Sequence, residues 1–252
     1  MREAKTKFKE NTTLDSLYTS ILHEAFGEDD DPDNDPRVRS VIGAILLAAN
    51  PLSSSTIATL LRFDIGDVLP LLSSAQSPFI FQEDINCPVM PFHKSFPDFI
   101  IDPDRRTNHR FHVSPPYHHS ELLISCLNLM GRRLEKNMCN LPDAAANSDV
   151  TDLKERTEQY IDPALRYACR SWHTHLIDGY TTSVDTLGIT SALHKFLERK
   201  FLFWLEVLSV LGAVKDAVDA LQTATEWLKV CPSFMVNVLP KSLRLDSGVS
   251  HT

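Results

Sequence analysis

The chain has 252 residues, 43% of them hydrophobic and 23% charged, which suits one large or two ordinary globular domains. Its 25 Lys and Arg residues against 33 Asp and Glu residues give a formal charge of −8, which argues against a nucleic-acid-binding surface spread over the whole chain. The longest apolar run, residues 41–49, is about half as long as a bilayer span requires.

The first residues lack an apolar signal core, so we expect a cytoplasmic protein with neither a membrane nor a nucleic acid as its partner. The five cysteines are odd in number and include no Cys-x-x-Cys pair, which disfavours a disulfide framework and a zinc site. The eight glycines form neither Gly-x-Gly-x-x-Gly nor Gly-x-x-x-x-Gly-Lys, the motifs of phosphate-binding loops. We therefore expect no enzymatic activity and no cofactor bound by this chain alone.

Residues 13–27 predict an amphipathic helix, because apolar side chains recur at helical spacing and Gly27 is a natural stop. The acidic, proline-containing stretch 28–35 then predicts a solvent-exposed linker. We interpret residues 1–36 as a linker helix followed by an acidic linker. The apolar positions of the helix are Leu14, Leu17, Tyr18, Ile21, Leu22 and Phe26.

Three short helices are predicted next. Residues 38–49 carry apolar side chains at helical spacing, and Asn50-Pro51 breaks the pattern. Ser53 can cap a second helix over residues 54–61, and Asp67 can cap a third that ends near Ala75.

A β-hairpin is predicted after these helices, because two short apolar runs, residues 79–81 and 89–92, flank a polar connection. Pro88 and Pro91 have no backbone N–H to donate, so the second run is expected to be an edge strand. Residues 111–113 could add a third strand. Three helices followed by a hairpin is the order of a winged helix, which we place at residues 37–113.

The rest of the chain predicts an α-helical domain over residues 114–230. Ser114 and Asp162, each followed by proline, are typical helix starts, and the polar residues 140–151 predict an exposed connection. The widest apolar stripe predicts one long helix over residues 193–211, with a second helix after Gly212.

Residues 231–252 lose all periodicity and predict a loose C-terminal tail. The expected fold is therefore mainly α, with a winged helix that has a small β-hairpin wing, followed by an α-helical bundle.

Ten histidines raise the alternative of a metal site. The candidates His109, His112, His118 and His119 fall across a predicted strand and a Pro-Pro junction with no cysteine beside them, so we interpret them as surface histidines and expect no metal. His173 and His175 lie two residues apart on a predicted helix, so their side chains should face different directions.

Binding of DNA is the alternative function for a winged helix, whose third helix reads the major groove with basic or amide side chains. Residues 66–76 contain no Lys or Arg and include Asp67, so the charge that dominates DNA affinity is missing. A stand-alone adaptor or a winged-helix DNA-binding protein remains the alternative interpretation.

Several blocks of the sequence resemble a known family. Residues 41–61 with Asn50-Pro51-Leu52-Ser53, residues 67–73, and residues 91–99 resemble the winged-helix part of fungal NACHT-type (STAND) signalling NTPases, which are often followed by WD40 repeats. Residues 165–176 and 193–221 are similar to the helical region that follows in those proteins. The resemblance covers roughly residues 13–230, while the P-loop, the acidic Walker B strand and the WD40 repeats are absent from this sequence.

The resemblance implies a non-catalytic regulatory segment of a nucleotide switch, which holds the inactive state and relays conformational change in signal transduction. Its partners would be a NACHT nucleotide-binding domain and WD40 or other sensor repeats, in cis or in trans. ADP or ATP would be the cofactor of a full-length parent. The chain looks like the middle of a larger molecule, or a truncated relative of one.

The resemblance also implies one site residue. In that class a histidine at the start of a winged-helix-domain helix contacts the β-phosphate of ADP, and His93 followed by Asp98-Phe99 has the matching spacing. Lys94 departs from the Met-His-Asp form of the motif, in which an aspartate follows the histidine. His93 is thus the candidate ADP phosphate sensor, effective only with a nucleotide-binding domain present. An imidazole N–H suits a phosphate acceptor, and simple helix capping by His93 is the alternative.

Overall fold

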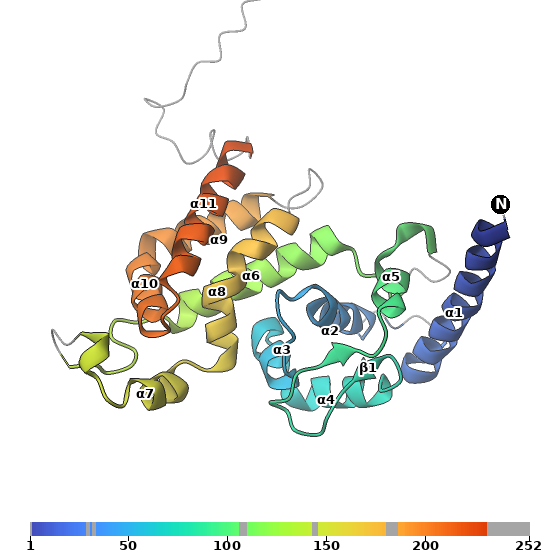
Figure 1. Ribbon diagram of the computed structural model, residues 1–252, viewed down its shortest axis with the longest axis horizontal. Coiled ribbons are helices and arrows are strands. Elements are labelled where there is room, and N and C mark those ends of the chain that lie inside the picture. The colour runs from blue at the N-terminus through green and yellow to red at the C-terminus, as the bar shows by residue number, and fades with distance from the viewer. Residues whose placement is uncertain are drawn as a thin grey trace, which may run out of the picture.

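The computed structural model describes residues 2–28, 31, 34–105, 110–142, 146–179 and 186–230. Within these residues the protein is mainly α-helical, with one two-stranded antiparallel sheet, as the sequence predicted. Figure 1 shows an elongated arrangement in which α1 projects at one end and α9, α10 and α11 gather toward the other. The predicted tail, residues 231–252, lies outside the described residues.

Helix α1 (Arg2–Phe26) begins earlier than predicted and ends where predicted, because Gly27 adopts a φ of 81° that favours glycine. Tyr18 and Leu22 are buried, whereas Leu17 is 53% exposed. The Tyr18 ring packs against Phe96 of α5 (Ser95–Ile101) at 5.3 Å between centroids. The apolar face of α1 is therefore covered by α5 and α4.

Three helices follow as predicted: α2 (Asp35–Leu47), α3 (Ser54–Leu61) and α4 (Ile65–Ser74). The Ser53 hydroxyl accepts a hydrogen bond from the Thr56 amide at 3.2 Å, which confirms the predicted cap of α3. The predicted cap of α4 is wrong. Asp64 caps this helix through the Gly66 amide, at 2.6 Å, and Asp67 lies within the first turn.

The hairpin is confirmed as β1 (Phe79–Ile80) and β2 (Met90–Pro91), which pair antiparallel with Phe79 opposite Pro91. The second run is not a simple edge strand, because Pro88 forms an isolated bridge with Ser53 and the Val89 amide donates to the Leu52 carbonyl at 2.8 Å. The prolines interrupt the ladder, and the intervening amide supplies the bond to the segment on the other side.

The expected third strand at residues 111–113 is wrong, since the described residues there form a turn and an irregular segment. The Val113 amide donates to the Ile100 carbonyl at 3.2 Å, so this segment is fixed to the end of α5 instead of the hairpin. A 3-10 turn, Pro103–Arg105, follows α5. Phe111 is buried, with its ring 5.6 Å from that of Phe26.

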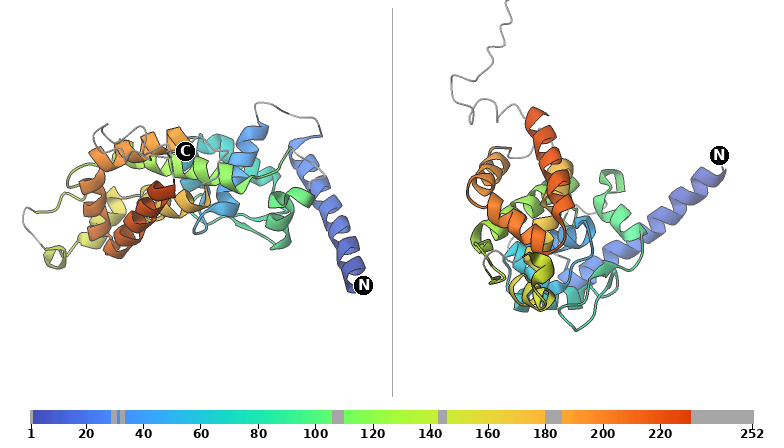
Figure 2. Two further views of the ribbon diagram at one scale, coloured as in Figure 1. Left: turned by 90° about the horizontal axis from the view of Figure 1, so that it is seen from above. Right: turned by 60° about the vertical axis from the view of Figure 1, so that its left-hand side comes forward.

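The second half contains α6 (Pro115–Arg133), a 3-10 turn (Asn147–Asp149), α7 (Leu153–Tyr160), α8 (Pro163–Asp178), α9 (Thr186–Arg199), α10 (Phe201–Val210) and α11 (Val214–Val230). Helices α6 and α8 pack along each other, with α9 against α6 and α11 against α8. The left-hand view in Figure 2 shows the C-terminal helices of this group at the end of the molecule away from the N-terminus of α1. Asp162 caps α8 through the Leu165 amide at 2.9 Å, as predicted.

Two expectations for this half are wrong. The predicted helix over residues 193–211 is divided into α9 and α10 at Lys200, whose side-chain amine donates to the Leu134 carbonyl just past α6, at 2.7 Å. Helix α7 lies next to the connection predicted at 140–151 and was not predicted, because it is short and mostly polar.

The two halves are packed together. Helix α2 contacts α6, and α3 contacts both α6 and α8. The Ser40 hydroxyl donates to the Glu121 carboxylate at 2.7 Å across this contact. The domain boundary predicted at residues 113 and 114 stays a prediction. Of the helices that the structure describes, none combines the length and apolar character needed to cross a bilayer.

The predicted acidic linker is partly structured. Asp35 opens α2 and is buried against Arg110, whose Nε donates to its carboxylate at 2.7 Å. The same guanidinium donates to the carbonyls of Gly27 and Phe26 at the end of α1. One arginine therefore fixes the last turn of α1 to the first turn of α2.

Candidate functional site

His93 lies in the short connection between β2 and α5, and its side chain is exposed. Its Nδ1 accepts a hydrogen bond from the Ser95 amide at 3.2 Å and lies 2.7 Å from the Ser95 hydroxyl oxygen. The same hydroxyl is 2.7 Å from the phenolic oxygen of Tyr18 on α1. The imidazole is thus oriented from α5 and, through Ser95, from α1.

These contacts define which ring nitrogen of His93 is available. Because Nδ1 accepts from a backbone amide, the neutral ring carries its proton on Nε2. That N–H belongs to an exposed ring and can donate to a phosphate or carboxylate oxygen. The capping role weighed for His93 is also present, since Nδ1 satisfies an amide in the first turn of α5.

The other residues of the motif around His93 differ in burial. Phe99 is buried, with its ring 5.4 Å from that of Tyr18, whereas Asp98 and Lys94 are exposed. Asp98 therefore remains accessible from solvent, and Phe99 holds α5 in place.

The outer face of the hairpin adds an apolar surface beside His93. Ile80 and Met90 pair across the two strands and are 41% and 39% exposed. Phe92, which directly precedes His93, is 71% exposed. Exposed apolar side chains next to a donor suit recognition of another molecule more than covalent chemistry.

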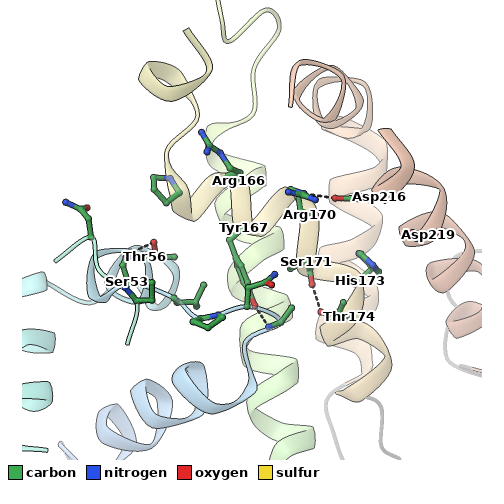
Figure 3. A pocket seen from close by; sticks show the side chains of 17 residues that line it. Ser53, Thr56, Arg166, Tyr167, Arg170, Ser171, His173, Thr174, Asp216 and Asp219 are labelled. Atoms are coloured by element: carbon green, nitrogen blue, oxygen red, sulfur yellow. Dashed lines mark hydrogen bonds and ion pairs between the residues drawn. The ribbon is translucent and has the colours of Figure 1, made fainter. Parts of the chain in front are cut away.

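A second candidate, missed from the sequence, is a cleft of about 580 Å³ between the α2–α3 connection and helices α8 and α11. Figure 3 shows Ser53 and Thr56 on one side of it, with Arg166, Tyr167 and Arg170 on the other. Its residues come from segments far apart in sequence, which is why no local pattern indicated it. The volume falls within the range of about 300–1,000 Å³ that small-molecule sites occupy.

The cleft carries charges of both signs. Arg170 donates through Nε to the Asp216 carboxylate at 2.6 Å. Arg166 donates to the Ile161 carbonyl at 3.3 Å, while its buried Nε and the buried Nδ1 of His173 have no hydrogen-bond partner among the described residues. Burial lowers the pKa of His173, against the opposing influence of the Asp216 and Asp219 carboxylates.

The histidines expected at the surface are largely inside. His118 and His119 are buried, and His112 bonds through Nδ1 to the Ile100 carbonyl at 2.9 Å. His109 lies outside the described residues. Within the part of the chain that is described, no group of three or more His, Cys, Asp or Glu side chains is placed to hold a metal ion.

His173 and His175 point in different directions, as predicted. His173 lines the cleft, whereas His175 is fully buried between Tyr167 and His119.

Two core thiols are poor nucleophiles. Burial raises the pKa of Cys126 to about 12, and burial also raises the pKa of Cys169. A thiol must ionise to react, so both cysteines are structural at neutral pH.

One similarity to a characterised protein was found. The chain is 26% identical over 231 residues to the vegetative incompatibility protein HET-E-1 of Podospora anserina. The match covers 83% of this chain and 16% of that protein, so the chain spans a small part of the relative's length. No protein-family model matches the chain, and no solved structure matches it.

Proposed function

We propose that this chain is a non-catalytic regulatory segment of a NACHT-type nucleotide-switch protein, in which a winged helix over residues 37–113 and a helical arm over residues 114–230 hold the inactive state. The resemblance of the sequence blocks to that class and the similarity to a fungal incompatibility protein support this proposal. The helical architecture supports it too. The partners would be a nucleotide-binding domain and sensor repeats such as WD40 repeats.

The arrangement of residues 37–91 supports the winged-helix interpretation. Helix α2 is followed by the Ser53 bridge segment, then by α3, α4 and the two strands. Ser53 pairs with Pro88, just before β2, and β1 pairs with β2 itself. A small unit of three helices with short paired strands is the arrangement expected of a winged helix.

The single observation that carries the proposed site is the orientation of His93. With Nδ1 held by the Ser95 amide, the exposed imidazole presents its Nε2 N–H outward. In the proposed role this N–H donates to a phosphate oxygen of ADP on the nucleotide-binding domain. A hydrogen bond involving a charged group contributes about 1.5–3 kcal/mol, which shifts a closed-to-open equilibrium about ten- to a hundredfold.

The test is ADP retention after gel filtration of a full-length parent that carries a substitution at His93. His93→Asn is the informative variant, because its side-chain oxygen can still accept from the Ser95 amide while the outer N–H is lost. We expect His93→Asn and His93→Ala to lose ADP faster than the parent. His194→Ala, which removes an exposed histidine on α9, is the matched control.

If His93→Asn keeps ADP as well as His194→Ala does, while His93→Ala releases it, then His93 is only a helix cap. If both His93 variants retain ADP, the imidazole has no role in nucleotide binding. The resemblance of the separate sequence blocks would survive either result.

The proposal also includes the absence of catalysis by this chain alone. Calorimetry of the isolated chain with ATP should detect no micromolar affinity, because phosphate-binding and Mg²⁺-holding motifs are missing from the sequence. Micromolar binding would require a different assignment of function.

DNA binding is the second candidate, favoured only by the winged-helix order. Helix α4 contains no Lys or Arg, and Asp67 is paired with Arg37 at 3.8 Å. We expect no shift of duplex DNA at submicromolar protein and physiological salt. A salt-sensitive shift would favour the DNA-binding alternative.

A further inference from the structure

A series of hydrogen bonds, partly buried at Ala49 and fully buried beyond Tyr167, connects the α2–α3 turn to the core of the helical half. The Ala49 amide donates to the phenolic oxygen of Tyr167 at 3.1 Å. That oxygen lies 2.7 Å from Nε2 of His175, and Nδ1 of His175 lies 2.9 Å from Nδ1 of His119. Nε2 of His119 lies 3.9 Å from the Asp178 carboxylate at the end of α8. We call the bond between Ala49 and Tyr167 the Ala49–Tyr167 joint.

The direction of each hydrogen bond is assigned from the Ala49 end. A backbone amide can only donate, so the Tyr167 oxygen accepts from Ala49. Among the described residues, Nε2 of His175 is the acceptor within reach of the buried Tyr167 proton, so we assign that proton to this bond. His175 then carries its own proton on Nδ1 and donates it to Nδ1 of His119. His119 consequently carries its proton on Nε2, which faces Asp178.

A proton added to His119 or His175 must break one of the hydrogen bonds in this series. Protonated His119 would place two N–H groups against each other over the 2.9 Å between the Nδ1 atoms. If His175 shifted its proton to Nε2 to avoid this, the Tyr167 oxygen would receive two N–H donors. The Tyr167 proton would then lose its acceptor within the described structure, and a buried polar group without a partner is costly.

Other ionisable groups surround the pair. Asp178 is the acidic group nearest to His119, and it is largely exposed, so it offsets only part of the cost of a positive charge there. The ionisable groups that act electrostatically on the histidine pair or on Tyr167 are Cys126 and His118 on α6, and His173 and Asp178 on α8. Within the described residues, His175 is hydrogen-bonded to Tyr167 and His119, and none of these groups takes the place of either.

We propose that the His119–His175 pair makes the Ala49–Tyr167 joint acid-sensitive, so that protonation of the pair releases the α2–α3 turn from helices α6 and α8. The joint lies where the proposed winged helix meets the helical arm. Its release would loosen the contact between the two halves while leaving helix α10 in place.

The electrostatics agree with the geometry. Burial lowers the pKa of His175 to about 3, and burial also lowers the pKa of His119 despite the nearby Asp178. Once released, each ring would return toward the ordinary value of about 6.5. The histidines of the released form therefore take up protons near pH 6. Lowering the pH from 7.5 to 5.5 should raise the equilibrium constant for release by about tenfold for each histidine that becomes exposed.

The test is hydrogen exchange of the Ala49 amide, measured by NMR on the whole chain and corrected for the intrinsic effect of pH. We expect the protection factor to fall about ten- to a hundredfold between pH 7.5 and 5.5. Amides of α10 should keep their protection over this range. Nitrogen shifts of the imidazoles at pH 7.5 should show the proton on Nδ1 of His175 and on Nε2 of His119.

Tyr167→Phe removes the joint but leaves both histidines, so its Ala49 amide should be unprotected and insensitive to pH from 7.5 to 5.5. The His194→Gln control should behave as the wild type. A His175 proton on Nε2 in the wild type would overturn the proposal, even if the Tyr167 variant did not fold. Constant Ala49 protection, or a parallel loss in α10, would overturn it as well.

Discussion

His118 of α6 packs directly onto Gly43 of α2. A β-carbon built on Gly43 would lie 2.6 Å from Cδ2 of His118, closer than real β-carbons approach a neighbour. The imidazole is fixed from the other side by a 2.9 Å contact between Nδ1 and the Ser114 carbonyl. The absence of a side chain at residue 43 therefore sets how closely α2 and α6 approach.

Gly43→Ala should destabilise the protein, although alanine is the better helix former. A glycine inside a helix normally costs about 0.5–1 kcal/mol relative to alanine. Here the added methyl must displace a buried ring, for which overpacking costs of about 1–3 kcal/mol are typical. We expect a lower midpoint of unfolding in urea.

Gly131→Ala in α6 is the matched control, because nothing lies within 4 Å of its added β-carbon. It should stabilise the protein by about 0.5–1 kcal/mol. If both variants raise stability, then α2 and α6 are not in the described contact.

Trp204→Ala should cost about 3–5 kcal/mol. Trp204 is fully buried, its indole N–H donates to the Cys169 carbonyl at 2.8 Å, and its ring lies 6.1 Å from that of Trp172. Thermal unfolding followed by circular dichroism measures the loss. Leu202→Ala on the same helix removes a 72% exposed side chain and should leave the midpoint nearly unchanged. Equal effects of the two variants would contradict the packing of α10 on α8.

Asp35→Asn should cost about 3–5 kcal/mol, because it removes the buried carboxylate charge to which the Arg110 guanidinium donates. Unfolding in urea at pH 7 checks this value. Asp152→Asn breaks an exposed i,i+4 pair with Arg156 and serves as the control, with no measurable loss expected. A loss of stability in Asp35→Asn as small as that in Asp152→Asn would show that Arg110 does not join α1 and α2 through Asp35.

The same pair gives a pH dependence at low pH. Burial works to raise the pKa of Asp35, but the hydrogen bond and charge of Arg110 outweigh it and hold that pKa below its ordinary value. A lowered carboxyl pKa contributes stability above about pH 4, which is lost as the pH falls through the folded value. The Asp35→Asn variant should therefore approach the wild type once the pH falls below the folded pKa of Asp35, as measured by urea unfolding over an acid pH series.

Between pH 8 and 5 the histidines should dominate the pH dependence. Burial lowers the pKa values of His118, His119, His173 and His175, so the folded protein binds fewer protons than the unfolded chain. Stability should thus be complete above about pH 6.5 and fall below it, with a slope of up to about 1.4 kcal/mol per pH unit for each histidine. Flat urea midpoints from pH 7.5 to 5 would contradict the burial of these rings.

Local signals predicted several helix starts and stops. Ser53 and Asp162 cap their helices as expected, since a cap needs only a side-chain oxygen and an amide two or three residues away. Gly212 also separates α10 from α11 as expected, with a φ of 65°. Asp67 was wrong as the cap of α4, because Asp64, three residues earlier, accepts from the Gly66 amide; the two aspartates have the same side chain, and only backbone geometry distinguishes them.

The sequence by itself determined the helical class and the hairpin, because each depends on spacing within a short stretch of chain. The candidate at His93 came from the resemblance of residues 91–99 to a known family and stays a prediction. Only the tertiary structure decided the breaking of the 193–211 helix at Lys200, the burial of Asp35 with Arg110, and the linking of His119 to His175. These features join residues far apart in sequence. A charged or histidine side chain looks the same in a local pattern whether it meets water or a buried partner, and it is the packing of α2, α6 and α8 that supplies the partner.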